Sequence, residues 1–175
     1  MYGMKRSELR LVPHDPEWAD DFIREKERIL AAVPNSNTRL EHIGSTSVPT
    51  VCSKPILDIA ILCENDELEK LTFALTRLGY DYRGQFDDES NHYYAVLDRD
   101  GMRLCQTHIY TEANRDWHSK LAFRDALETD QQLANEYNGY KLNLVKTGVR
   151  KKEYAGIKDK WMDTFVIKVL GTHTD

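Results

Sequence analysis

One strand-like segment, PILDIAIL at residues 55–62, most constrains the fold, because it is apolar except for a single carboxylate, Asp58. Side chains alternate between the two faces of a sheet, so Leu57, Ile59 and Ile61 share one face. We expect that face to pack under helices. Asp58 then lies on the opposite face, near the start of the strand, where a buried carboxylate needs hydrogen-bonding partners.

The loop directly before this strand, GSTSVP at Gly44–Pro49, can supply such partners. Its glycine permits close backbone approach, and Ser45, Thr46 and Ser47 carry hydroxyl groups. Gly-Ser turns with exposed N–H groups form cradles for anions such as phosphate. A carboxylate beside a cradle also suits Mg²⁺, which takes one or two carboxylates together with phosphate oxygens. A purely structural role is the alternative, in which the hydroxyls cap the turn and Asp58 accepts hydrogen bonds from it.

The remaining elements follow from hydrophobic spacing and turn residues. The predicted elements are helices at 16–33 and 66–78, strands at 39–43, 55–62, 92–97 and 103–110, and helices beyond residue 110. Two apolar stripes mark the last helices, one of Leu133, Tyr137, Tyr140 and Leu144 and one of Tyr154, Ile157, Trp161 and Phe165. This order predicts an α+β fold in one domain spanning residues 1–175, with a small mixed sheet covered by helices and a helical C-terminal third. Strands and helices do not alternate regularly, and the glycine motifs of Rossmann and P-loop proteins are missing, so neither of those classes is favoured.

Composition narrows the class of protein. A content of 41% hydrophobic and 30% charged residues is ordinary for a globular domain. No apolar run reaches the roughly 18 residues of a membrane span, and the N-terminus lacks a signal-peptide core. The three cysteines form no C-x-x-C pair, which favours a reducing cytoplasm. The net charge of −5 argues against nucleic acid as a partner, and the locally basic run 146–154 is most simply a solvated helix end.

The segment EHIGSTSVPTVCSKPILDIAI, residues 41–61, closely resembles the signature of the GrpB family, also called UPF0157. The resemblance continues in VPHDPEWADDFIREKERI, LGYDYRG, QTHIY, WHSKLAFRDAL and RKKEYAGIKDKWM, and so covers most of the chain. It implies a minimal nucleotidyltransferase-like fold of the polymerase-β palm type. Members of the family also occur fused to dephospho-CoA kinase, which points by analogy to coenzyme A or adenylates.

The resemblance also implies site residues. Nucleotidyltransferases combine a Gly-Ser turn with Asp-x-[Asp/Glu] on a strand and a third acid on a neighbouring strand. Gly44, Ser45 and Asp58 fit this pattern, whereas the second acid is replaced by Ala60. The third position falls on the 103–110 strand. Alternation puts Leu104, Gln106, His108 and Tyr110 on one face of that strand, and His108 is the best candidate to approach Asp58. The implied catalytic and metal-binding residues are therefore Asp58 and His108, with Mg²⁺ or Mn²⁺ as the cofactor. Alanine and imidazole in place of two acids weaken a hard Mg²⁺ site.

Other residues are assigned around the loop. His42 and Glu41 alternate on the preceding strand, so only one of them faces the site; the family motif favours His42 for a structural or ligand role and leaves Glu41 as a pairing residue. Lys54 either contacts phosphate or lies at the surface. The predicted ligand-binding set is Gly44, Ser45, Thr46, Ser47, Lys54 and His42.

Two further groups lie on helical segments. Arg124 and Asp125 are expected to form a structural ion pair. Arg150, Tyr154 and Lys158 recur at helical spacing on one face, which either is solvated or supplies cations to a phosphate, and solvation is the preferred interpretation.

Three functions remain open. The chain is a nucleotidyltransferase that moves an NMP group from an NTP, a non-catalytic module that binds a nucleotide or phosphorylated small molecule, or a structural interaction domain. Ala60 favours the second over the first. The concentration of polar groups at residues 42–58 disfavours the third.

Overall fold

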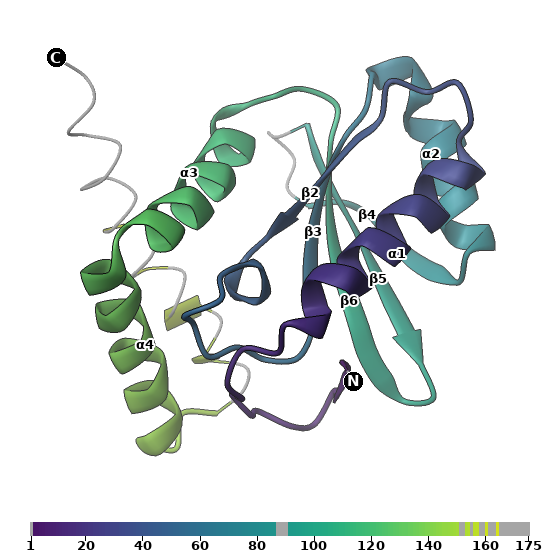
Figure 1. Cartoon of the computed structure of the whole chain (residues 1–175). Coiled ribbons are helices and arrows are strands. Elements are labelled where there is room, and N and C mark those ends of the chain that lie inside the picture. The colour runs from purple at the N-terminus through teal and green to yellow at the C-terminus, as the bar shows by residue number, and fades with distance from the viewer. Residues whose placement is uncertain are drawn as a thin grey trace, which may run out of the picture.

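A mixed sheet between two pairs of helices forms the body of the molecule (Figure 1). The computed structural model describes residues 2–86, 91–150, 153, 154, 156, 157, 160 and 164. The strands are β1 (Met4–Lys5), β2 (Arg39–Ile43), β3 (Leu57–Leu62), β4 (Tyr80–Gln85), β5 (His92–Arg99) and β6 (Met102–Tyr110). The helices are α1 (Glu17–Ala32), α2 (Leu68–Arg77), α3 (Arg115–Thr129) and α4 (Gln131–Lys146), with 3₁₀ turns at Ser45–Ser47 and Asn65–Glu67.

The strand order of the sheet is β2-β3-β6-β5-β4, and β1 pairs with the first two residues of β6, Met102 and Arg103. Strands β3 and β6 run parallel, whereas every other pair is antiparallel. Since α2, β4 and β5 intervene in the chain between β3 and β6, the parallel pair brings distant sequence segments side by side. The expected α+β fold with a mixed sheet is confirmed.

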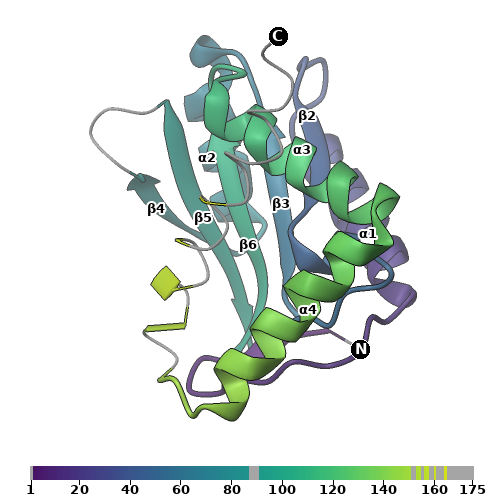
Figure 2. The ribbon, with the colours of Figure 1, turned by 90° about the vertical axis from the view of Figure 1, so that its left-hand side faces the viewer.

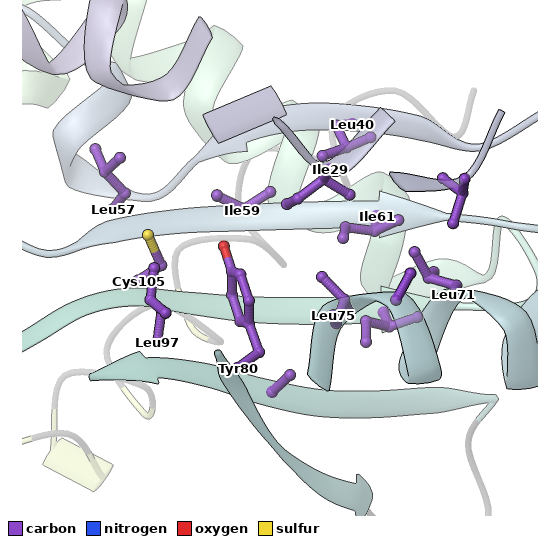
Figure 3. Packing of buried hydrophobic residues seen from close by; sticks show 14 of the residues in the cluster. Ile29, Leu40, Leu57, Ile59, Ile61, Leu71, Leu75, Tyr80, Leu97 and Cys105 are labelled. Carbon is purple, nitrogen blue, oxygen red and sulfur yellow. The ribbon is translucent and has the colours of Figure 1, made fainter. Parts of the chain in front are cut away.

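The helices are divided between the two faces of the sheet. Helices α1 and α2 lie on one side, and α3 and α4 lie on the other (Figures 1 and 2). The main core forms under α1 and α2 and contains Leu57, Ile59 and Ile61 of β3, as their alternation predicts (Figure 3). Trp18 and Ile29 of α1 close this core from the helical side.

Local sequence signals account for several boundaries. Pro16 precedes α1, and Gly79, with φ 90°, follows α2 and donates its N–H to the carbonyl of Thr76 at 3.0 Å. Asp100 and Gly101 both have positive φ and form the turn between β5 and β6. These elements were predicted within about two residues at either end, the usual scatter of such boundaries.

Strand β4 was not among the predicted elements. It alternates Tyr80 and Tyr82 with charged or polar residues, and Gly84 interrupts the pattern. Tyr80 is buried, and its hydroxyl donates to Glu25 Oε1 at 2.6 Å. The strand is at the edge of the sheet, where one neighbour and a few inward side chains suffice, so its sequence signal is weak.

The chain beyond α4 is described only in part. Of the apolar stripe predicted there, Tyr154 is buried and Ile157 is exposed, while Trp161 and Phe165 lie outside the described residues. Among the residues that the structure describes, no helix combines the length and apolar character needed to cross a membrane.

Candidate functional site

A cavity of about 60 Å³ lies where the Gly44–Ser47 loop meets the start of β3 and helix α4. Its described lining consists of Leu11, Ser45, Thr46, Ser53, Lys54, Ile56, Asp58, Gln106, Lys141 and Tyr154. Two of these residues are lysines and one is a carboxylate. The lining therefore has an excess of positive charge, which suits an anionic group.

Gly44 permits the loop backbone to lie directly against Asp58. Its φ is 70°, in the left-handed region, and a Cβ placed there would lie 2.5 Å from Asp58 Oδ2 and 3.0 Å from Asp58 Cβ. A side chain at this position would therefore displace Asp58. The glycine of the motif is therefore required both by its backbone conformation and by the close approach of the carboxylate.

The three hydroxyl groups of the loop have different surroundings. Ser47 Oγ donates to the carbonyl of Gly44 at 2.7 Å, so it caps the turn as the structural alternative proposed. Thr46 is buried, and its hydroxyl lies 3.0 Å from His42 Nε2. Ser45 Oγ instead accepts a hydrogen bond from Lys141 Nζ at 3.2 Å. Ser45 is thus the loop hydroxyl that meets a cation.

Lys141 of α4 was not identified from the sequence. Its side chain is 1% exposed, and its ammonium group also donates to the carbonyl of Cys52 and lies 4.3 Å from the centre of the Tyr137 ring. Tyr137 belongs to the predicted apolar stripe of this helix, and a residue four positions later lies on the same face. The sequence showed only that Lys141 lies four residues after an apolar residue of the helix. This spacing does not distinguish a buried lysine from one at the edge of the apolar face.

Lys54 and Tyr154 complete the cationic side of the cavity. Lys54 Nζ lies 4.4 Å from the centre of the Tyr154 ring, and both residues line the cavity. Tyr154 is 1% exposed, so the preference for a solvated face at Arg150, Tyr154 and Lys158 is wrong at Tyr154. Arg150 is exposed and paired with Glu153, and Lys158 lies outside the described residues.

Gln106, rather than His108, is the residue of β6 directly opposite Asp58. Its Nε2 donates to Asp58 Oδ1 at 2.9 Å. His108 stands opposite Ala60, and its Nδ1 lies 2.9 Å from His92 Nε2. Alternation correctly placed both residues of β6 on the face of Asp58, but the parallel register selects Gln106 as its neighbour. A catalytic and metal-binding role for Asp58 and His108 stays a prediction.

His42 points to the other face of the sheet. It pairs with Ile59 in the β2–β3 ladder and stacks on Phe22 of α1, with ring centres 4.8 Å apart. Burial, together with the nearby His14 and Arg124, lowers the pKa of His42 to about 4. Its described contact to the site is through Thr46, which supports the structural role; the ligand role stays a prediction.

Glu41 and Arg124 form the expected structural pairs. Glu41 lies on the face of Asp58, opposite Ala60, and accepts a hydrogen bond from Arg124 Nη1 at 3.0 Å. Burial would raise the pKa of Glu41, but hydrogen bonds from Arg124 and Arg39 outweigh it and lower that pKa. Arg124 also contacts Asp125 Oδ1 at 2.8 Å and the carbonyl of His42 at 3.0 Å, which ties α3 to the strand before the loop.

The donor set at Asp58 limits which metal arrangement fits. Asp58 is the one acid among the described lining residues, Ala60 fills the second acid position, and the described part of the chain contains no group of three His, Cys, Asp or Glu side chains able to hold a metal. Such a set fits one divalent ion shared with phosphate oxygens of a ligand. It does not fit the pair of ions used in two-metal transfer.

The sequence and the fold both have known relatives. The profile of the family described as GrpB protein matches residues 8–168. A UPF0157 protein of Halalkalibacterium halodurans is 31% identical over 153 residues, which is 86% of this chain and 76% of the relative. The crystal structure of the conserved protein GrpB from Enterococcus faecalis superposes with a TM-score of 0.83 and 26% identity, covering 95% of this chain and 100% of that one.

A more distant structure shares the fold. The Cid1 poly(U) polymerase, in an H336N mutant bound to MgATP, superposes with a TM-score of 0.58 and 11% identity, over 79% of this chain and 46% of that one. The likeness shows that the fold is nucleotidyltransferase-like. The chain belongs to the GrpB family, as its loop and strand motif predicted.

Proposed function

We propose that this GrpB-family chain binds the phosphate group of a nucleotide, or of another phosphorylated small molecule, at the Gly44–Ser47 loop. The observation that carries the proposal is the buried ammonium group of Lys141, which lies 3.2 Å from Ser45 Oγ at the cavity beside that loop. A buried cation is costly unless anionic or polar groups surround it. A phosphate oxygen at Ser45 would be a charge-assisted partner for Lys141.

The shape and charge of the cavity support the same proposal. Lys54 adds a second cation to the lining, and Ser45 and Thr46 add loop hydroxyl groups to it. The volume of about 60 Å³ is far below the roughly 300–1,000 Å³ of sites that enclose a whole drug-sized ligand. The cavity therefore suits one end of a ligand, with the remainder outside it.

Asp58 lies at the same cavity, and a carboxylate repels a phosphate unless positive charge separates them. A divalent ion, Mg²⁺ or Mn²⁺, would supply that charge when bound between Asp58 and the phosphate oxygens. The hydrogen bond from Gln106 orients the carboxylate and occupies Oδ1. We therefore expect affinity for phosphorylated ligands to rise with Mg²⁺ and to lose that dependence in Asp58→Asn.

Nucleotidyl transfer is the second candidate function. One specific observation favours it: Asp58 lies beneath the Gly-Ser loop at the first acid position of a fold that is shared with Cid1, which was solved with MgATP. Ala60 at the second acid position, and an amide, Gln106, rather than an acid opposite Asp58 on β6, make binding the stronger proposal. Turnover of an NTP by the wild-type protein, abolished in Asp58→Asn without loss of stability, would favour transfer.

The test is a ligand panel monitored by thermal unfolding and calorimetry. It contains the four NTPs, coenzyme A, dephospho-CoA and tripolyphosphate, each with and without Mg²⁺ or Mn²⁺. A ligand present at 100 times its dissociation constant should stabilise the protein by about 2.7 kcal/mol. Ser45→Ala and Lys141→Met should reduce the shift, whereas Lys146→Met, at an exposed position of the same helix, should not. The absence of a shift with every ligand would contradict the proposal and favour a structural interaction domain.

A further inference from the structure

Four rings gather on the sheet face that carries Asp58, beyond Gln106 of the cavity lining. Asp58 faces Gln106 on β6, and two residues further along β6 His108 faces Tyr94 on β5. Directly paired residues of neighbouring strands project from the same face of a sheet. The face of the sheet that carries Asp58 therefore continues along β6 and onto β5.

We define the ring shelf as Phe86, His92, Tyr94 and His108. Phe86 stacks on His92 with ring centres 4.6 Å apart and meets the edge of Tyr94 at 6.0 Å. Tyr94 meets His108 edge-on at 5.3 Å, and the two histidines are 2.9 Å apart between Nε2 and Nδ1. The backbone N–H of Phe86 donates to the carbonyl of His92 at 2.7 Å. These contacts hold the four rings in a fixed arrangement.

The shelf has a buried base and an exposed top. His92 is 3% exposed and is stacked on Tyr110 beneath it, with ring centres 4.6 Å apart. Phe86 is 59% exposed, although it is held against three other rings. A rigid, exposed aromatic ring beside a polar cavity presents a flat apolar surface on which another planar ring can stack.

The shelf lies within reach of the cavity. Burial and the Asp58 carboxylate together outweigh Arg103 and Arg83 and raise the pKa of Tyr94 to about 12, so the phenol lies within the electrostatic influence of Asp58. The exposed ring of the shelf, Phe86, follows β4, but its centre lies 6.4 Å from that of His108, which is two residues along β6 from Gln106. One strand spacing and two residues along the strand, roughly 8 Å, separate His108 from Asp58, so the path from Asp58 to the Phe86 ring is roughly 15 Å. The triphosphate and sugar of a nucleotide can bridge such a distance.

We propose that the ring shelf stacks the base of a nucleotide whose phosphate end occupies the cavity at Ser45 and Lys141. This inference rests on the proposed phosphate-binding function and narrows its ligand to molecules with a planar aromatic base. Stacking on aromatic rings tolerates every base, because each has a π-face. The shelf therefore distinguishes nucleotides from phosphorylated molecules without a ring, and discriminates weakly among the four bases.

The test compares the four NTPs with tripolyphosphate, which has the same phosphates and no base, by calorimetry in the presence of Mg²⁺. Phe86→Ala removes the exposed ring, and Phe86→Trp retains a stacking surface. Phe73→Ala is the matched control, because Phe73 is also an exposed phenylalanine, 65% accessible, but lies on α2. The thermal midpoint of each variant shows whether the fold is retained.

The wild-type protein should bind at least one NTP more tightly than tripolyphosphate. Phe86→Ala should weaken that NTP by roughly fivefold or more, the loss typical of one stacked base, and leave the affinity for tripolyphosphate unchanged. Phe86→Trp and Phe73→Ala should both retain wild-type affinity for the NTP.

The failure of the shelf and the failure of the phosphate site give different results. If tripolyphosphate binds as tightly as every NTP, or if Phe86→Ala binds both ligands normally, the shelf proposal is overturned and the phosphate site stands. If Phe86→Ala weakens both ligands equally, the ring acts on the cavity and not on a base, which also overturns it. If neither ligand class binds the wild-type protein, both proposals are overturned.

Discussion

The two faces of strand β3 differ in which side chains they bury. On one face, Leu57, Ile59 and Ile61 are fully buried under α1 and α2. On the other face, Ala60 is buried against the Trp117 side of α3, while Asp58 remains half-buried at the cavity. Alternate residues of one strand thus build a hydrophobic core and a polar site that are separated by the thickness of a single sheet.

The buried charges on the two faces show the same contrast. Under α1 and α2, Glu25 receives hydrogen bonds from Arg28 Nε at 3.0 Å and from the Tyr80 hydroxyl at 2.6 Å, so cation and anion are matched within the core. At the cavity, Lys141 and Lys54 face one acid of the described lining, Asp58. A matched pair of opposite charges fixes the structure around it, whereas an excess of positive charge suits a negatively charged ligand.

The largest effect is expected from the packed face. Ile59→Ala should lower the free energy of unfolding by about 2–5 kcal/mol, because it removes a fully buried side chain and leaves a cavity. Leu62→Ala, at a half-buried position on the opposite face of the same strand, should cost less. Urea unfolding measures both. Equal losses for the two variants would show that the faces do not differ in packing.

A pH effect should come from His42, which lies on the face of the sheet that packs under α1. Its pKa is about 4 in the folded protein and about 6.5 when unfolded, so the unfolded chain takes up the proton first. Stability is therefore unaffected above pH 6.5, falls as the pH drops from about 6.5 to 4, and levels off below that. The total loss is about 3 kcal/mol. His42→Gln should flatten this part of the unfolding free energy measured against pH, and an unchanged slope would contradict the assignment.

The third prediction concerns the close contact of loop and strand. Gly44→Ala should destabilise the protein by about 1–3 kcal/mol and abolish phosphate binding, because its Cβ would displace the Asp58 carboxylate. Gly84→Ala is the control: its φ is 82°, but no atom lies within 4 Å of the added Cβ, so it incurs only backbone strain. Thermal unfolding and calorimetry separate the two. Similar behaviour of both variants would show that the clash with Asp58 is unimportant.

The smallest stability change is expected at Lys141. Lys141→Met replaces a buried cation with an apolar side chain of similar length, so the free energy of unfolding should change by less than about 1 kcal/mol or increase. Affinity for a phosphorylated ligand should fall by roughly tenfold or more, the value of a lost hydrogen bond to a charged group. If stability falls sharply while affinity for the ligand is retained, Lys141 stabilises the fold and does not bind the phosphate.

Much of the fold could be predicted from the sequence, because periodicity within one element is a local property. Alternation in residues 55–62 separated Asp58 from the core side chains, helical spacing placed α1 and α2, and the GSTSVP motif with Asp58 identified the family. The edge strand β4 escaped prediction, since few of its side chains are buried and its sequence carries little apolar signal.

The identity of the groups around Asp58 depended on the tertiary structure. Alternation places Gln106 and His108 on the same face, but only the parallel register of β3 and β6 makes Gln106 the neighbour of Asp58. Likewise, the sequence identified Gly44, Ser45 and Asp58 at the loop, whereas the docking of α4 brought Lys141 to Ser45 across 96 positions of the chain. Local periodicity determines which residues share a face; contacts between distant segments determine which of them meet.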